Sequence, residues 1–290
     1  MTNYKKIIFL FIFLIICVIA LTVFLFFYNP QKNLKVNFLD VGQGSSILIQ
    51  TPYDQNILID GGDSDAKVLK QLPIFMPFYD RTIDLVILTH PHDDHVGGLV
   101  KVLKRDEVKK ILYTGVVHTS PAYLEFLKII RDKNISLTII DRQQKIILGD
   151  DLALEILYPF ESFLNKEVEN LNNTSIVAML IYKDNKFLFT GDMEKEVEEV
   201  FVKQRPDIQA DVMLAGHHGS DTSSSEDFLQ LVKPAYALIQ SGADNEFGHP
   251  SLRVLRRFDK MQILYLRNDL SGWARFVSDG EVLTYVVDKQ

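Results

Sequence analysis

The stretch THPHDDHVGG, residues 89–98, follows the apolar run IDLVIL and places three histidines and two aspartates within six positions. Imidazoles and carboxylates packed at the end of a buried strand are costly to remove from water unless a cation satisfies them together. His90 and His92 stand two residues apart in an extended chain, so their side chains point to the same side. Asp94 and His95 begin the helix that follows and can turn toward a second metal ion. Because imidazole and carboxylate without sulfur suit zinc, manganese or iron, the stretch indicates a metal site rather than a polar surface loop.

Two later strand ends carry the same kinds of side chain. The run KFLFTGDMEKE ends a predicted strand at Gly191 and Asp192 and then starts a helix, which places Asp192 within reach of two metal ions. The run DVMLAGHHGS ends another strand with His217 and His218. A Gly-Asp turn taken alone is more often a helix cap. Together with residues 89–98, however, these positions favour one shared metal site.

An uninterrupted apolar run, IIFLFIFLIICVIALTVFLFF, occupies residues 7–27. As a helix it would extend about 32 Å, enough to cross the hydrocarbon core of a bilayer, so we predict a transmembrane anchor over residues 7–28. A cleaved signal peptide is the alternative, but it would have a shorter apolar stretch and a cleavage site with small residues, which FFYNPQ does not offer. The only cysteine, Cys17, lies inside the run, so neither a disulfide nor thiolate metal binding is expected.

The rest of the chain is predicted to form a short tail over residues 1–6, a linker over 29–34 and one folded domain over 35–290. The positive charges of Lys5, Lys6 and the terminal amine outweigh those on the far flank of the anchor. This bias predicts a cytoplasmic N-terminus and a domain outside the cytoplasm. The net charge of −7 argues against non-specific, charge-driven binding to nucleic acid.

From residue 35 onward, short strand-like runs alternate with amphipathic helical ones. Strands are predicted over residues 35–41, 46–51, 56–60 and 84–88, and in later runs such as LALEILY and SIVAMLIY. Helices are predicted over residues 93–105, 121–133 and 193–204, and within HPSLRVLRRF, residues 249–258. Interleaved strands and helices of this kind predict an α/β sandwich with sheets inside and helices outside.

The chain resembles the metallo-β-lactamase fold superfamily. HPHDDH, residues 90–95, matches the His-x-His-x-Asp-His signature of that superfamily. The runs FLDVGQGSSILIQT, NILIDGG, LFTGD, GHHGS and FGHPS resemble the extracellular hydrolase domain of the ComEC/Rec2 competence proteins, which act in DNA uptake. The likeness covers residues 35 to about 280 and implies a metallo-β-lactamase-like αββα sandwich of four layers. The multi-span channel portion of those proteins has no counterpart here, so the resemblance implies the hydrolase chemistry and not DNA translocation.

The resemblance implies a site for two divalent metal ions, manganese or zinc. The ligands that it implies are His90 and His92 for the first ion, Asp94, His95 and His218 for the second, and Asp192 for both. His217 would then meet the substrate or protonate a leaving group. Two such ions activate water for attack on phosphorus, with Asp94 and Asp192 holding them in place, so no nucleophilic side chain is required. A Ser-His-Asp triad is the poorer account, because no paired base accompanies the serines.

Two aspartates that end predicted strands resemble supporting residues of the superfamily. Asp60 of LIDGG and Asp40 of FLDVG are expected to orient metal-bound histidines. The alternative for both is a turn residue at the end of a strand.

The first metal ion lacks the third histidine that most members of the superfamily supply. The only histidine between HPHDDH and Asp192 is His118, which lies early, before a predicted helix. The run NLNNTSIVAML stands in the expected place and resembles the Asn-x-Ser pattern of the competence group, so Asn173 or Ser175 is expected to face the metal or the substrate. A neutral oxygen in place of an imidazole favours manganese over zinc.

The substrate is indicated by a basic stripe. Arg253, Arg256 and Arg257 follow His249 at helical spacing, where they are placed to grip a phosphodiester backbone; the alternative is an ordinary solvated helix face. We therefore expect a membrane-anchored nuclease that acts on DNA outside the cytoplasm. Two alternatives stay open: a phosphodiesterase that acts on cell-envelope polymers, as in the similar phosphorylcholine esterases, and a metal-stabilised binding module without catalysis.

Overall fold

The structure, a computed structural model, describes residues 3–27, 33–65, 67–77 and 79–289. The chain divides into two compact units, Met1–Lys32 and Asn33–Gln290. The first contains helix α1, Asn3–Phe27, whose length and apolar composition make Tyr4–Phe24 a candidate membrane span. Residue 28 of the predicted anchor and residues 29–32 of the predicted linker lie outside the described residues.

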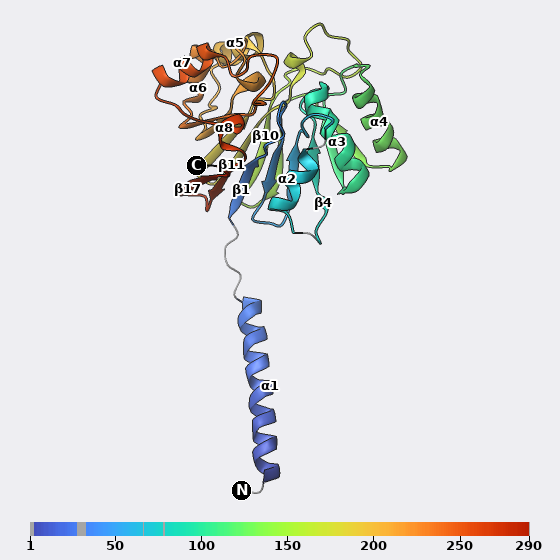
Figure 1. Cartoon of the computed structure of the whole chain (residues 1–290), viewed down its shortest axis with the longest axis vertical. Helices are drawn as coiled ribbons and strands as arrows, with labels where there is room; N and C mark the ends of the chain where they lie inside the picture. The colour runs from blue at the N-terminus through green and yellow to red at the C-terminus, as the bar shows by residue number, and fades with distance from the viewer. Residues whose placement is uncertain (1–2, 28–32, 66, 78, 290) are drawn as a thin grey trace. The chain divides into compact units, whose positions relative to one another are not determined.

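Two large sheets form the second unit (Figure 1). Within the described residues, one sheet has eight strands in the order β17-β16-β1-β2-β3-β5-β7-β8, and the other has seven in the order β15-β14-β13-β12-β11-β10-β9. The strands of the first sheet are β1 (Leu34–Phe38), β2 (Ile47–Gln50), β3 (Asn56–Ile59), β5 (Leu85–Ile87), β7 (Lys110–Tyr113), β8 (Ser136–Ile139), β16 (Ala274–Ser278) and β17 (Leu283–Val287). Those of the second are β9 (Gln144–Gly149), β10 (Leu152–Tyr158), β11 (Val177–Tyr182), β12 (Asn185–Phe189), β13 (Val212–Leu214), β14 (Tyr236–Ile239) and β15 (Leu264–Arg267). A short pair, β4 (Thr82–Ile83) and β6 (Glu107–Val108), lies apart from both.

Helices cover the outer face of each sheet. They are α2 (Val68–Phe75), α3 (Asp93–Arg105), α4 (Pro121–Asp132), α5 (Lys195–Gln204), α6 (Glu226–Val232), α7 (Leu252–Lys260) and α8 (Asn268–Ser271), with short 3-10 turns η1 (Asn172–Thr174) and η2 (Gly216–Gly219). The helix predicted over residues 93–105 is confirmed, whereas the one predicted from residue 193 begins two residues later, at Lys195. Figure 1 shows α3 and α4 on one side of the sheets and α5, α6 and α7 on the other.

Three apolar clusters separate the four layers. The alternation along β3 shows the pattern: Ile57 and Ile59 point into the core between the sheets, while Leu58 points to the helical side. Residues of α2, α3 and α4 pack against the first sheet, and residues of α5, α6 and α7 pack against the second. The predicted four-layer αββα architecture is therefore confirmed.

The candidate metal ligands follow the carboxyl ends of strands. β3 pairs in parallel with β5 in the first sheet, and β12 pairs in parallel with β13 and β13 with β14 in the second. Parallel neighbours end at the same edge of a sheet, which is where open α/β sheets bind ligands. The loops after β3 and β5 therefore meet the loops after β12 and β13 at one edge.

Candidate metal centre

Five side chains gather at that edge in two overlapping groups. His90, His95 and Asp192 form one group and Asp94, His95 and His218 form the other, and in each group the candidate ligand atoms lie within 4.8 Å of one another. The Oδ2 atom of Asp192 lies 3.7 Å from His90 Nε2 and 3.3 Å from the Nε2 atoms of His95 and His218. Asp192 thus occupies the middle of the cluster. His92 adds a further nitrogen, since its Nδ1 lies 3.0 Å from His90 Nε2.

Asp60 orients His95 from behind. Its Oδ2 accepts a hydrogen bond from Thr89 Oγ1 at 2.7 Å and lies 2.8 Å from His95 Nδ1, while its Oδ1 accepts the Thr89 N–H at 2.8 Å. The carboxylate is fully buried and its residue adopts a left-handed backbone with φ of 55°. Strained backbone of this kind is typical of functional sites. Holding Nδ1 in this way leaves His95 Nε2 facing the cluster.

Glycines allow this arrangement because α3 approaches the loop after β3 very closely. A Cβ at Gly98 would collide with the carbonyl oxygen of Gly61. The close approach lets Gly61 N–H donate to His95 O at 2.8 Å and Gly98 N–H donate to Gly62 O at 2.9 Å. The glycines of HVGG and DGG therefore place Asp60 beside His95.

The two neighbouring histidines of GHHG have different positions. His218 is buried and its Nδ1 bonds to Gln240 O at 2.8 Å, so its Nε2 faces Asp94 Oδ2 at 3.1 Å. His217 lies outside the two groups, with Nδ1 3.0 Å from Glu194 Oε1. Left-handed backbone at both residues, with φ of 48° and 55°, turns the two rings in different directions. The geometry therefore places His218 among the candidate ligands and His217 at the side of the pocket.

Strong electrostatic coupling links the histidines and carboxylates. Burial lowers the pKa of His218, but Asp192 and Asp94 outweigh it and raise that pKa to about 10. Burial likewise opposes the charge of His95, yet Asp192 and Asp60 hold its pKa well above the ordinary value. By contrast, burial and the nearby His95 hold the pKa of His90 well below its ordinary value. Without another cation, protons on His95 and His218 compensate the buried carboxylates.

The donor set fits a divalent cation. Asp192 is buried, and its Oδ1 atom has no hydrogen-bond partner among the described residues. A buried carboxylate oxygen without a donor is costly unless a cation satisfies it. Burial raises the pKa of Asp192, but His218 and His95 hold it well below the ordinary value, so the carboxylate is charged. Imidazoles and carboxylates in this proportion suit zinc, manganese or iron.

The structure corrects the expectation for Asn173 and Ser175. Asn173 Oδ1 accepts a hydrogen bond from Glu194 N–H at 2.9 Å and its Nδ2 donates to Glu196 Oε2 at 3.1 Å, so its side chain serves the start of α5. Ser175 Oγ accepts the N–H of Asp192 at 3.0 Å and is thereby used in shaping the loop. Neither residue lines the pocket that contains the cluster.

Asn172, the residue before Asn173, is the asparagine of this loop that faces the pocket. It lines the pocket, is buried, and its Oδ1 has no hydrogen-bond partner among the described residues. The 3-10 turn over Asn172–Thr174 directs consecutive side chains to different sides. The Asn-x-Ser pattern, on which the prediction for Asn173 and Ser175 was based, does not indicate such a turn. His118 also lines the pocket, and its ring centroid lies 6.2 Å from that of His92.

The basic stripe of α7 does not line the pocket, which corrects its predicted role. Arg253 Nη1 donates to Asp221 Oδ2 at 2.8 Å, and Arg257 pairs with the other oxygen of Asp221. Arg256 is exposed. The helix is oriented by its buried residues Val254 and Phe258, which turn the arginines toward Asp221 and solvent.

His249, in contrast, does line the pocket, with its ring centroid 5.5 Å from that of His217 and the ring of Phe247 stacked on it at 5.9 Å. Burial and the nearby His217 lower the pKa of His249 to about 4. The whole pocket has a volume of about 510 Å³, within the range of small-molecule sites.

Asp40 also departs from its expected role. Its Oδ1 accepts a hydrogen bond from Gly42 N–H at 3.3 Å, and among the described residues it makes no hydrogen bond to a histidine. Asp40 lines a different pocket, described below. Of the two alternatives for this residue, the structure favours the turn residue.

The comparisons with known proteins agree with this geometry. The family profile described as the metallo-beta-lactamase superfamily matches residues 39–242, which is most of the chain. The chain belongs to the metallo-beta-lactamase superfamily. It is thus a metal-dependent hydrolase by family, with His and Asp groups suited to binding metal ions.

Curated relatives of the chain include proteins named for competence. The chain is 29% identical to ComE operon protein 3 of Bacillus subtilis (strain 168), over 91% of the chain and 36% of that protein. It is 32% identical to Competence protein ComA of Neisseria gonorrhoeae, over 85% of the chain and 33% of that protein. The chain therefore spans about a third of the length of these relatives.

Among solved structures, the fold is similar to that of CmlA, a diiron beta-hydroxylase from Streptomyces venezuelae. The TM-score is 0.55 and the sequence identity 13%, over 86% of this chain and 54% of that one. At this identity the likeness concerns the fold alone.

Proposed function

We propose that the protein is a membrane-anchored phosphodiesterase that uses two divalent metal ions to cleave DNA outside the cytoplasm. The observation that carries the proposal is the central position of Asp192. One oxygen of its carboxylate lies within 3.7 Å of His90 on one side and within 3.3 Å of His95 and His218 on the other. A single carboxylate between two sets of ligands is the arrangement that two-metal hydrolases require.

The proposed ligands fall into two sets that share this carboxylate. The first ion would be held by His90, His92 and Asp192, and the second by Asp94, His95, His218 and Asp192. When bound, such ions make water a nucleophile near neutral pH and neutralise charge that develops on a phosphate. Manganese is the preferred metal, because Asn172, which lines the pocket, would offer a neutral oxygen in place of an imidazole.

Residues at the side of the pocket would handle the leaving group. Glu194 lies 3.0 Å from His217 Nδ1, and Thr222 Oγ1 lies 3.1 Å from the same atom. A carboxylate beside Nδ1 accepts the proton on that nitrogen and fixes the orientation of the ring; donation to a leaving group would use a second proton, carried on Nε2 of the imidazolium form. We assign His217 to proton donation toward the departing oxygen, with Glu194 as its positioning residue.

DNA is proposed as substrate because the relatives bear competence names and the phosphodiester chemistry suits the site. The anchor is assigned to α1, and Lys5 and Lys6 before its apolar run favour the domain outside the cytoplasm. Protease added to intact spheroplasts should then digest the domain, whereas protection until lysis would contradict this orientation.

The test uses the full-length protein in detergent, stripped with EDTA and reloaded with manganese or zinc. We expect turnover of bis-p-nitrophenyl phosphate and of single-stranded or duplex DNA. The variant His92→Ala should lose at least about a hundredfold of both activities, because it removes a metal ligand. Cleavage of teichoic-acid fragments but not DNA would favour an envelope substrate, and metal binding without any turnover would favour a binding module.

A further inference from the structure

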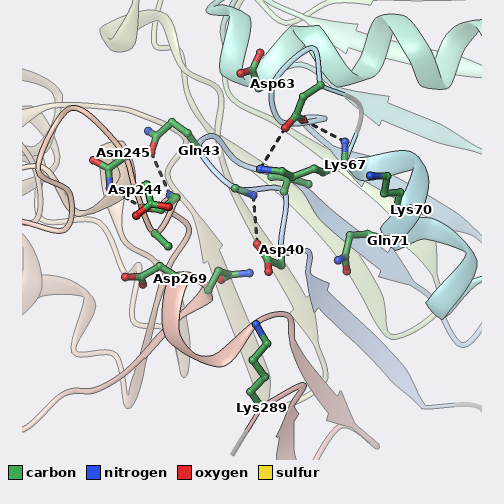
Figure 2. Close-up of a pocket in the computed structure, with 16 residues that line it drawn as sticks. Asp40, Gln43, Asp63, Lys67, Lys70, Gln71, Asp244, Asn245, Asp269 and Lys289 are labelled. Carbon is green, nitrogen blue, oxygen red and sulfur yellow. Dashed lines mark hydrogen bonds and ion pairs between the residues drawn. The ribbon is translucent and has the colours of Figure 1, made fainter.

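A second pocket adjoins the candidate metal centre (Figure 2). It has a volume of about 610 Å³, also within the range of small-molecule sites. Gln43 and Asp63 line both pockets, so the two are neighbours that share these residues. Gln43 Oε1 accepts the N–H of Gly242 at 3.2 Å and joins the loop after β1 to the loop after β14. Residues of that second loop line both pockets: Ala243, Asp244 and Asn245 on one, Phe247 and His249 on the other.

Two amide oxygens at the second pocket lack hydrogen-bond partners within the described part of the chain. Asn268 is buried, and its Nδ2 donates to Leu39 O at 3.0 Å, which fixes the amide with Oδ1 unused. Gln71 also lines the pocket, and its Oε1 has no partner either. Buried acceptors without donors are rare in folded proteins, and each one calls for an explanation. A ligand that presents N–H or O–H groups would satisfy both.

Three lysines also line the pocket: Lys67, Lys70 and Lys289. Figure 2 shows Lys289 reaching toward the space between Asp40 and Asp269. Among the described residues, neither Lys70 nor Lys289 pairs with a carboxylate, whereas Lys67 Nζ lies 3.2 Å from Asp65 Oδ2. Gly42 leaves room for the Lys67 ammonium, because a Cβ there would collide with it.

The charges and the amide oxygens of the second pocket indicate which class of ligand it can bind. Five aspartates line the pocket with the three lysines, so a run of phosphates would be repelled, while one phosphate can be met by the unpaired lysines. Amide and carboxylate acceptors suit the N–H and O–H groups of a nucleobase and a sugar. We propose that this pocket binds one nucleotide of the strand whose neighbouring phosphodiester occupies the metal centre. The proposal rests on the nuclease function proposed above.

The test compares two substrates on the full-length protein. Bis-p-nitrophenyl phosphate is small and occupies the metal centre alone, whereas a single-stranded oligodeoxynucleotide would fill both pockets. In the double variant Lys70→Gln, Lys289→Gln we expect KM for the oligonucleotide to rise at least about tenfold, since each charge-assisted contact to phosphate is lost. KM for the small ester should change by less than about twofold, because neither lysine lines the catalytic pocket.

A matched control is Lys128→Gln, Lys203→Gln, which removes two exposed lysines that line neither pocket. It should leave both KM values unchanged. Equal effects of the two double variants, or an equal rise of KM for both substrates in the first one, would overturn the proposal.

A binding measurement separates this inference from the nuclease function. Deoxyadenosine monophosphate is titrated calorimetrically into EDTA-treated protein, in which the metal centre has no cation to attract phosphate. We expect binding to the wild-type protein and to the Lys128, Lys203 control, and at least about tenfold weaker binding to the Lys70, Lys289 variant. Failure of wild-type protein to bind the nucleotide overturns the second pocket even if DNA is cleaved. Binding that depends on the lysines in a protein that cleaves no DNA supports the pocket and refutes the nuclease.

Discussion

The two sides of the candidate metal centre are built in different ways. On one side, HPHDDH supplies its candidate ligands from six consecutive residues, 90–95, which run from the loop after β5 into the first turn of α3. On the other side, Asp192 and His218 come from separate loops, which meet only because β12 and β13 pair in parallel. Local backbone geometry therefore sets the spacing of the side chains in HPHDDH, whereas the pairing of distant strands sets the positions of Asp192 and His218. A local motif can be read in a sequence, but an assembled one has to be inferred from its context.

The largest effect on the candidate metal centre is expected from Asp192, which lies between its two sides. Asp192→Ala should lower phosphodiesterase activity by more than about a hundredfold. Mutation of a residue that only hydrogen-bonds a metal ligand already lowers metal affinity or activity about 10–100-fold. Both metal ions should be lost, because Asp192 lies between His90 and the pair His95 and His218. Elemental analysis and turnover of bis-p-nitrophenyl phosphate measure the two effects.

Asp192→Asn is the matched control for size. It keeps the shape of the side chain but removes its charge, so it should also be inactive. Loss of one ion only in the alanine variant, or full activity in the asparagine variant, would show that Asp192 does not hold both ions.

The contrast between the two sides also explains what the sequence could predict. The layers, the helix at residues 93–105 and the HPHDDH cluster follow from apolar periodicity and spacing, and the structure reproduces them. The orientation of Asn172 and Asn173 depends on a 3-10 turn, which the spacing does not encode. The arginines of α7 have the spacing of a binding stripe, but Asp221, distant in the sequence, pairs with two of them. The features missed were therefore those decided by an irregular local turn or by one partner distant in the sequence.

Asp60 and Asp40 offer a paired test of the supporting role that the sequence assigned to both. Asp60 contacts His95 at 2.8 Å, whereas Asp40 accepts its hydrogen bond from Gly42. Asp60→Asn should therefore weaken metal affinity about 10–100-fold, the usual effect of losing a carboxylate behind a histidine ligand. Asp40→Asn should leave metal affinity within about twofold. Competition titrations with a chelator give both values, and equal effects in the two variants would contradict the structure.

The coupled histidines predict that metal and protons compete. In the metal-free protein the pKa of His218 is raised to about 10 and that of His95 is also raised, so both hold protons at pH 7. A metal ligand must be deprotonated, so binding should release about two protons per protein near neutral pH. As pH falls, protons compete more strongly and metal affinity should decrease.

Calorimetry in buffers with different ionisation enthalpies measures the number of protons released. The control is His118→Ala, which changes a histidine that lines the pocket but lies outside both ligand groups. It should leave the number of released protons unchanged. Metal binding with no proton release at pH 7 would contradict the prediction that His95 and His218 hold protons in the metal-free protein and lose them to the ions.

The smallest expected effects come from two neighbours in the loop that faces the centre. Asn172 lines the pocket with an unpartnered Oδ1, while Asn173 accepts a hydrogen bond from Glu194 N–H at 2.9 Å. Asn172→Ala should weaken manganese binding several-fold and cost less stability than Asn173→Ala, because its side chain makes a long hydrogen bond, from Nδ2 to Glu194 Oε1 at 3.3 Å. Asn173→Ala should leave manganese binding nearly unchanged and lower the free energy of unfolding by about 1 kcal/mol or more, because two shorter hydrogen bonds are lost. Urea titration of the metal-free protein and manganese titration of the folded protein separate the two. The two substitutions are chemically identical and adjacent, so they can be compared directly. If Asn173→Ala weakened manganese binding more than Asn172→Ala, the oxygen that faces the metal would belong to Asn173, as the Asn-x-Ser pattern predicts.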